Sequence, residues 1–243
     1  MADLILGRNA VLEALKSGRN IDKVTVQKTD GQHSAPIKQI IAKAKQRKIP
    51  VYYSDKAHMD KTPGHHGVIA VASDFEYCQV DDMLQLAEER GEKPLLIILD
   101  GIEDPHNLGA IMRTAECAGS HGVIIPKRHS VSVNETVLKT SAGAAEYMPC
   151  AKVTNIAATI DELKKKGVWI YACDMGDGLI YDQDLTEAVA VVVGGEGFGI
   201  SRLVKEKCDF VVSIPMSGNV NSLNASNAAA IFIYEAVRQR LRK

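Results

Sequence analysis

Short apolar runs alternate with amphipathic stretches along most of the chain. In the second part, continuous runs of Val, Ile and Leu are typical of buried strands, and stretches with apolar residues three and four positions apart predict helices. We expect strands at residues 95–99, 122–125, 168–172, 188–193 and 210–214, and helices at residues 108–118, 133–145, 156–166, 201–207 and 222–242. Apolar strands that alternate with helices predict an α/β fold with a parallel sheet covered on both faces.

The first 75 residues show the same two periods in shorter elements. We expect helices at residues 9–16 and 37–47, and strands at residues 23–27, 51–53 and 68–72. This pattern predicts a small α/β domain at residues 1–75. Residues 76–93 are more polar, with a helix-forming stretch that ends at Gly91 before Pro94. We therefore expect a linker at 76–93 and a second domain at 94–243.

The amino-acid composition indicates a globular protein but does not by itself indicate a function. Hydrophobic residues make up 46% and charged residues 24% of the 243 residues, as in ordinary soluble globular proteins. The net charge of −1 argues against a strongly basic nucleic-acid-binding protein, although RNA contacts depend on local patches. Candidate patches, each equally compatible with a solvated face, are Lys43, Lys45, Arg47 and Lys48; Lys127 and Arg128; and Arg238, Arg240, Arg242 and Lys243.

The spacing of the cysteines and the pattern of the first residues bear on the cellular compartment of the protein. The five cysteines are scattered and never spaced as C-x-x-C, which argues against disulfides and a structural zinc site, so we expect no metal. No secretory signal pattern and no apolar run of membrane-spanning length is visible. We expect a soluble protein of the cytoplasm that does not enter a membrane.

Three polar loops follow predicted strands, at the sheet edge where α/β proteins bind ligands. The first leads into a helix that contains Asn107 and Arg113. Six residues make about 1.7 helical turns, so these side chains do not share one face unless Arg113 reaches back. Asn107 could simply cap the helix and Arg113 could be a surface charge. The apolar neighbours Met112 and Ala115 favour a functional role for Arg113.

The second loop, residues 194–199, has the sequence GGEGFG. Glycines directly after a strand allow the backbone to approach a ligand closely. The spacing does not fit the dinucleotide fingerprint G-x-G-x-x-G, and no acidic residue follows at the ribose-binding distance. A nucleotide-dependent oxidoreductase is therefore disfavoured. Glu196 within this loop suggests chemistry, with a plain tight turn as the alternative.

The third loop, residues 214–228, runs into the last predicted helix. Ser222, Asn224 and Asn227 crowd the beginning of an Ala-rich stretch, whereas a helix needs only one cap. Such a crowd of short polar groups favours a helix start that packs against a ligand or another chain. A purely structural arrangement is the alternative.

Taken together, these loops resemble the motifs of the SpoU (TrmH-type) branch of the SPOUT RNA methyltransferases. The matching segments are NLGAIMRT at 107–114, GGEGFG at 194–199, IPMSG at 214–218 and SLNAS at 222–226. The segment LGRNAVLEAL at 6–15 is similar to the start of the family's L30e-like RNA-binding domain. The most similar subgroup methylates a guanosine ribose in 23S rRNA. The resemblance implies a C-terminal trefoil knot and a homodimer.

The resemblance also implies a cofactor, S-adenosylmethionine, and roles for the loop residues. The residues implied to bind the cofactor are Gly194, Gly195, Ile214, Met216 and Leu223, and those implied in catalysis are Arg113, Asn107, Glu196, Ser222 and Asn224. Arginine holds its proton too firmly to be a convincing base. We therefore interpret Arg113 as a fixed charge that stabilises the developing 2′-oxyanion, with Glu196 as its orienting partner or the proton acceptor. A tRNA methyltransferase and a non-catalytic RNA-binding or ribosome-assembly protein remain alternatives.

Overall fold

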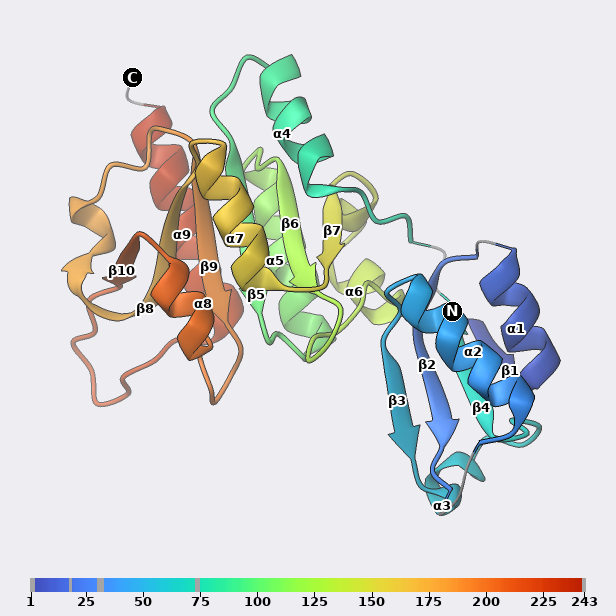
Figure 1. Cartoon of the computed structure of the whole chain (residues 1–243). Coiled ribbons are helices and arrows are strands. Elements are labelled where there is room, and N and C mark those ends of the chain that lie inside the picture. Colours follow the sequence, from blue (N-terminus) through green and yellow to red (C-terminus); the bar gives the residue numbers. More distant parts are fainter. Residues whose placement is uncertain (1–2, 18, 30–32, 73–74, 242–243) are drawn as a thin grey trace. The chain divides into compact units, whose positions relative to one another are not determined.

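The computed structural model describes residues 3–17, 19–29, 33–72 and 75–241, and the chain divides into two compact units, Met1–Glu76 and Tyr77–Lys243 (Figure 1). Each unit contains its own sheet and helices. Within these ranges, no helix is both long and apolar enough to span a lipid bilayer.

The first unit is a four-stranded mixed sheet with its helices packed into one core. Its elements are β1 (Asp3–Leu6), α1 (Arg8–Lys16), β2 (Ile21–Gln27), α2 (Ala35–Gln46), β3 (Val51–Ser54), α3 (Lys56–Met59) and β4 (Val68–Ala72). The sheet order is β1-β4-β2-β3, and only β2 and β3 pair in parallel. Alternate residues of β2, Val24 and Val26, share the core with Val11 and Ile40 of the two long helices. The expected small α/β domain is present, and the four-residue elements β1 and α3 are additional because they are too short to show a period.

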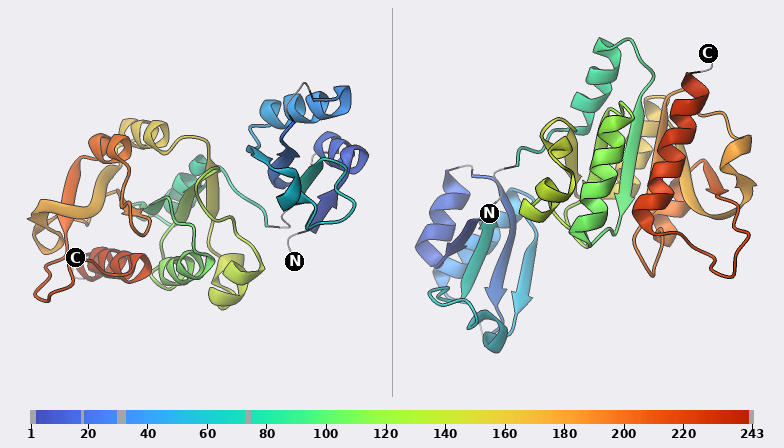
Figure 2. Two further views of the ribbon diagram at one scale, coloured as in Figure 1. Left: turned by 90° about the horizontal axis from the view of Figure 1, so that it is seen from below. Right: turned by 180° about the vertical axis from the view of Figure 1, so that it is seen from behind.

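The second unit is a three-layer α/β structure. Its elements are α4 (Val80–Glu89), β5 (Leu95–Asp100), α5 (Pro105–Cys117), β6 (Gly122–Pro126), α6 (Glu135–Thr140), η1 (Ala144–Glu146), β7 (Cys150–Val153), α7 (Ile156–Lys165), β8 (Trp169–Leu179), η2 (Ile180–Asp182), β9 (Val189–Gly194), α8 (Arg202–Lys207), β10 (Phe210–Ser213) and α9 (Ala225–Arg240). The six strands are all parallel, in the order β10-β8-β9-β5-β6-β7. Figure 2 shows α5 and α9 on one face of this sheet and α7 and α8 on the other. The predicted parallel sheet covered on both faces is confirmed.

Two predicted helices differ from the structure for local reasons. The predicted helix 133–145 is divided into α6 and η1, because Ala142 and Gly143 take left-handed backbone angles with φ of 51° and 88°. The last helix begins at Ala225 rather than at residue 222, because the side chain of Asn224 caps it. Strand β7 was not predicted, since its four residues are too few to show a period.

The expected linker, residues 76–93, contains α4, which packs against the second unit. Met83 of α4 is fully buried in that unit's core. A Cβ at Gly122 would lie only 2.2 Å from the sulfur of Met83, so the glycine leaves the space that this methionine fills. Lys166 forms an ion pair with Asp81 at the start of the helix. The polar helix is therefore an integral part of the second unit.

Several members of the candidate basic patches serve the fold. Arg238 forms a two-pronged ion pair with Glu235, a buried residue of the same helix. Arg47 donates hydrogen bonds to backbone carbonyls of the first unit, and Arg240 does so in the second unit. Arg242 and Lys243 lie outside the described residues. The C-terminal patch is therefore engaged within the protein at both of its described arginines.

Arg240 ties the end of α9 to the sheet. Its Nη1 donates to the carbonyl of Lys93 at 2.7 Å, its Nη2 donates to Glu187 at 2.6 Å and Pro94 at 3.0 Å, and its Nε donates to Leu185 at 3.3 Å. Burial lowers the pKa of this guanidinium, but it remains charged. We expect Arg240→Ala to reduce the free energy of unfolding by roughly 2 kcal/mol, because four backbone carbonyls, two of them partly buried, lose a charged donor.

The matched control is Arg202→Ala, which removes the same charge from an arginine whose side chain is 92% exposed. Urea denaturation followed by circular dichroism should show a lower midpoint for Arg240→Ala and an unchanged one for Arg202→Ala. Equal midpoints for both variants would contradict a structural role for Arg240.

Candidate active site

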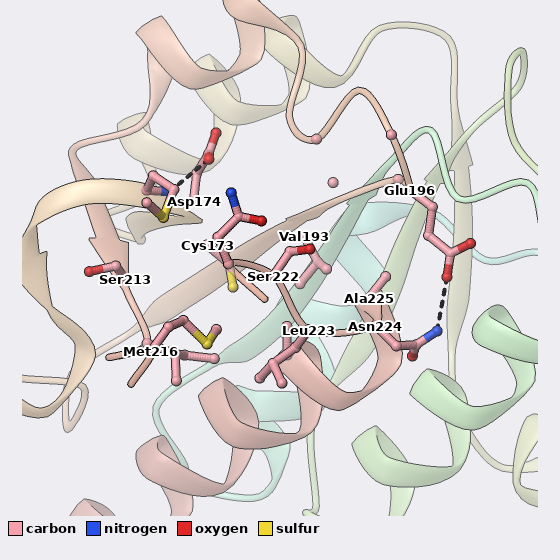
Figure 3. Close-up of a pocket in the computed structure, with 18 of the residues that line it drawn as sticks. Cys173, Asp174, Val193, Glu196, Ser213, Met216, Ser222, Leu223, Asn224 and Ala225 are labelled. Atoms are coloured by element: carbon pink, nitrogen blue, oxygen red, sulfur yellow. Dashed lines mark hydrogen bonds between the residues drawn. The ribbon is translucent and has the colours of Figure 1, made fainter. Parts of the chain in front are cut away.

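A pocket of about 500 Å³ opens at the carboxyl ends of β9 and β10, beside the middle of β8 (Figure 3). Its size suits a small organic ligand, and its position is the one expected for a parallel sheet. Its wall includes residues of the second and third polar loops. All five residues that the resemblance assigns to cofactor binding line it: Gly194, Gly195, Ile214, Met216 and Leu223.

The glycine-rich loop is folded tightly against its surroundings. A Cβ on Gly194 would lie 2.1 Å from the carbonyl carbon of Gly199, and one on Gly195 would lie 2.1 Å from the oxygen of Gly101. Neither distance is possible for a real side chain, so both glycines are required for packing. Asp100 fastens the loop, because its backbone oxygen accepts from the Gly195 N–H and its carboxylate accepts from the Ser201 N–H at 2.8 Å. Close backbone packing therefore explains these glycines as directly as close approach to a ligand.

Three candidate residues from different elements form one hydrogen-bonded network beside the pocket. Asn107 of α5 donates through Nδ2 to Oε1 of Glu196 at 2.9 Å. Asn224 donates through Nδ2 both to that oxygen and to Oδ1 of Asn107, each at 2.9 Å. Asn107 is buried and does not cap α5, because Asp104 is the residue whose carboxylate accepts from the first turn. The structural alternative for Asn107, a helix cap, is therefore wrong.

Asn224 has two structural duties at once. Its Oδ1 accepts from the Ser226 N–H at 2.9 Å and from the Ser226 hydroxyl at 2.6 Å, which caps α9. Its Nδ2 is thereby turned toward Glu196 (Figure 3). Ser222 lines the pocket without belonging to this network. The cap geometry thus fixes the amide that orients the carboxylate.

Arg113 lies away from this cluster. It is exposed on α5, whereas Asn107 on the same helix is buried, as their spacing predicted. It does not line the pocket, and it makes no hydrogen bond or ion pair with other residues of the described part of the chain. Within one chain, the structure therefore does not bring Arg113 to the pocket, and its guanidinium is available to an external partner.

The pocket also contains residues that sequence reasoning did not single out. Cys173, Asp174 and Met175 of β8 line it, and Oδ2 of Asp174 accepts from Lys205 at 3.0 Å. They follow directly on the predicted strand 168–172, so the strand-end rule applied to this strand as well would have found them. Burial and the charge of Asp174 raise the pKa of the Cys173 thiol far above its usual range. Cys173 therefore stays protonated and is unsuited to act as a nucleophile.

Comparison with known proteins identifies both units. Residues 94–234 match the SpoU rRNA Methylase family, and residues 4–78 match the family described as RNA 2'-O ribose methyltransferase substrate binding. YacO of Bacillus subtilis (strain 168), which carries the name of a TrmH family tRNA/rRNA methyltransferase, is 44% identical over 241 residues. The alignment covers 98% of this chain and 96% of YacO.

Solved structures support the same assignment. The SpoU methyltransferase AviRb from Streptomyces viridochromogenes, crystallised with AdoMet, matches 99% of this chain and 91% of its own, with 25% identity and a TM-score of 0.63. The A. aeolicus TrmH/SpoU tRNA modifying enzyme matches 67% of this chain and 84% of its own, with 29% identity and a TM-score of 0.57. The expected SPOUT fold is confirmed. The chain belongs to the SpoU (TrmH) family of RNA methyltransferases, whose cofactor is S-adenosylmethionine.

Proposed function

We propose that this protein methylates a ribose 2′-hydroxyl in structured RNA and that its target is a guanosine of 23S rRNA. The observation that carries the 2′-hydroxyl assignment is the Asn107–Glu196–Asn224 network, which holds a carboxylate at the wall of the cofactor pocket. A ribose hydroxyl needs such an oriented acceptor because it does not lose its proton readily. The match of residues 4–78 to a 2'-O ribose methyltransferase substrate-binding family supports the same choice. A tRNA target is the second candidate, since YacO's name covers both RNAs.

The pocket suits S-adenosylmethionine chemically. Two carboxylates line it, and of these Glu196 favours the positively charged sulfonium, whereas Asp174 is already paired with Lys205. Met216 and Leu223 offer an apolar wall for the adenine, and Gly194 and Ile214 would contact the cofactor through their backbone. When bound, the cofactor supplies an electrophilic methyl group for in-line displacement.

The residues of this chain would position and activate the other partner. Glu196, held through one oxygen by two amide donors, has its second oxygen free of contacts with the described residues and is placed to accept the 2′-hydroxyl proton. Arg113 would hold a neighbouring phosphate and stabilise the developing 2′-oxyanion. Ser222 would add a hydroxyl contact at the pocket wall. In this assignment Glu196 takes the proton, and Arg113 stabilises the negative charge.

We infer further that the working enzyme is a knotted homodimer in the cytoplasm. An exposed Arg113 that one chain does not bring to its own pocket is readily understood if a second copy supplies it. The knot would lie in the segment that lines the pocket between β9 and α9. Both features follow from the family resemblance stated above.

The proposal is tested by mapping ribose methylation. Unmodified 23S rRNA and total tRNA are incubated with the protein and labelled S-adenosylmethionine, and 2′-O-methyl positions are read by resistance to alkaline hydrolysis. We expect a single guanosine of 23S rRNA to gain the label. Label in tRNA alone would show that tRNA, and not 23S rRNA, is the target. Label on a base would refute methylation of the ribose.

Removal of residues 1–76 should separate cofactor binding from RNA selection. The cut belongs at 76 because α4 is part of the second unit's core. We expect the shortened protein to bind S-adenosylmethionine as before in calorimetric titration, while methylation of 23S rRNA falls by roughly 100-fold because the remote RNA contact is lost. Full activity of the shortened protein would show that the first unit is dispensable.

A further inference from the structure

The first unit carries a stacked pair of rings at the exposed edge of its sheet. Tyr53 lies on β3, the edge strand, and His33 lies just before α2. Their ring centroids are 5.9 Å apart with an interplanar angle of 20°, and Tyr53 is 48% exposed. An aromatic residue that served only the core would be buried. The pair instead presents a flat π surface to the outside.

Positive charge gathers at the same end of this unit. Strand pairing of Gln27 with Ser54 and of Val26 with Val68 brings the ends of β2 and β3 together with the beginning of β4. The lysine and arginine residues in the segments at this end are Arg8, Lys28, Lys56 and Lys61, and His58, His65 and His66 are close to them in sequence. The described carboxylates here are Asp55, paired with Lys28 at 3.3 Å, and Asp60, paired with His65 at 3.1 Å. In a chain with a net charge of −1, this end is locally basic.

A flat ring surface at the basic end of this unit matches the chemistry of a nucleic acid. Nucleobases stack on Tyr and His rings, while lysine and arginine bind the adjoining phosphates. Only an unpaired base can offer its face, because a base within a duplex is covered on both sides by its neighbours. Helix α2 begins two residues after His33, and its N-terminal amides add partial positive charge for a phosphate.

We infer that Tyr53 and His33 form a stacking platform for an unpaired nucleobase of the substrate RNA, with the lysines and Arg8 at the same end of the unit holding its backbone. The inference rests on the proposed function in taking RNA as the ligand. It adds a defined place on the first unit where single-stranded RNA is distinguished from duplex. The target guanosine would thus be chosen partly through an unpaired base elsewhere in the fold of the RNA.

The neighbouring Tyr52 provides a matched control. Tyr52 is also exposed, at 38%, but successive residues of a strand point to opposite faces. In register, Tyr53 pairs with the buried Val26, whereas Tyr52 pairs with Thr25. Substitution of either tyrosine by alanine removes the same ring from the same edge strand. One variant removes the ring from the sheet face that carries the platform, and the other removes it from the opposite face.

The experiment measures binding of two RNA probes by the full-length protein, a hairpin with an adenosine loop and a blunt duplex of equal length. We expect Tyr53→Ala to weaken hairpin binding by roughly tenfold or more, as for one lost base stack, and to leave duplex binding unchanged. Tyr53→Phe, which keeps the ring, and Tyr52→Ala should bind the hairpin like the wild type. Binding of S-adenosylmethionine should be equal in all variants, because the pocket belongs to the second unit.

The outcomes separate this inference from the proposed function. If the wild type methylates RNA but Tyr53→Ala binds the hairpin as Tyr52→Ala does, the stacking platform is refuted and the proposed methyltransferase function is retained. Equal losses on hairpin and duplex would also refute it. If no RNA is methylated while Tyr53→Ala alone loses the hairpin, the platform stands and the proposed function fails.

Discussion

Replacement of Arg113 by alanine should lower the rate of methyl transfer by about 10²- to 10³-fold, the range found when one preorganised charge-stabilising group is removed. The affinity for S-adenosylmethionine should not change, because Arg113 does not line the pocket of its own chain. Arg113→Lys should also lose most of the activity, since lysine lacks the planar fork that binds two phosphate oxygens together. Single-turnover rates and calorimetric titration with the cofactor measure the two effects separately.

Arg202→Ala, which removes an exposed arginine from α8, should leave the rate unchanged. Near-full activity of Arg113→Lys would sink the interpretation that a planar, two-pronged contact is required. Weak cofactor binding by Arg113→Ala would instead assign the residue to the pocket.

Mixing two inactive variants shows which chain supplies Arg113. In a dimer of Arg113→Ala with Glu196→Gln, one site has both intact residues only if Arg113 acts on the partner's pocket. We therefore expect the mixture to recover activity that neither variant has alone. A mixture as inactive as its components would place both residues in the site of one chain. Arg113 would then not act on the pocket of the partner chain.

Glu196→Gln should reduce the rate by about 100-fold or more while leaving the structure intact, because general-base catalysis contributes on that scale. The substitution removes the negative charge of residue 196 but keeps the shape of its side chain. The amide oxygen of glutamine can still accept the hydrogen bonds that Asn107 and Asn224 donate to Oε1. What is lost is the ability to take a proton, so the pH dependence of the rate should change shape. A pH–rate profile that matches the wild type would exclude Glu196 as the proton acceptor.

Asn224→Asp offers the complementary change. An aspartate keeps the oxygen that caps α9 but loses both N–H groups that hold Glu196 and Asn107. It also places a second carboxylate beside Glu196, and the two negative charges repel each other. The carboxylate of Glu196 should therefore be misoriented, although helix α9 remains stable. Loss of thermal stability together with activity would show that the network is primarily structural.

The sequence by itself determined the architecture of the second unit because its strands are apolar throughout. A strand such as β5, with five consecutive buried residues, can exist only where both faces of the sheet are covered. The same reasoning placed the three polar loops at the ends of predicted strands, and the motif order indicated the family. Short elements escaped prediction for the opposite reason, since β1 and β7 have four residues each and show no period.

The tertiary structure alone decided which candidate residues lie in contact. Residues 107, 196 and 224 are far apart in the chain, and only packing of α5 and α9 beside the glycine-rich loop brings their side chains within 2.9 Å. The structure also assigned Arg240 to the fold, placed α4 in the second unit and left Arg113 outside the pocket. None of this follows from spacing, because hydrogen bonds between distant segments depend on where the core holds their backbones. Local periodicity reports burial, whereas the site is made by contacts between elements.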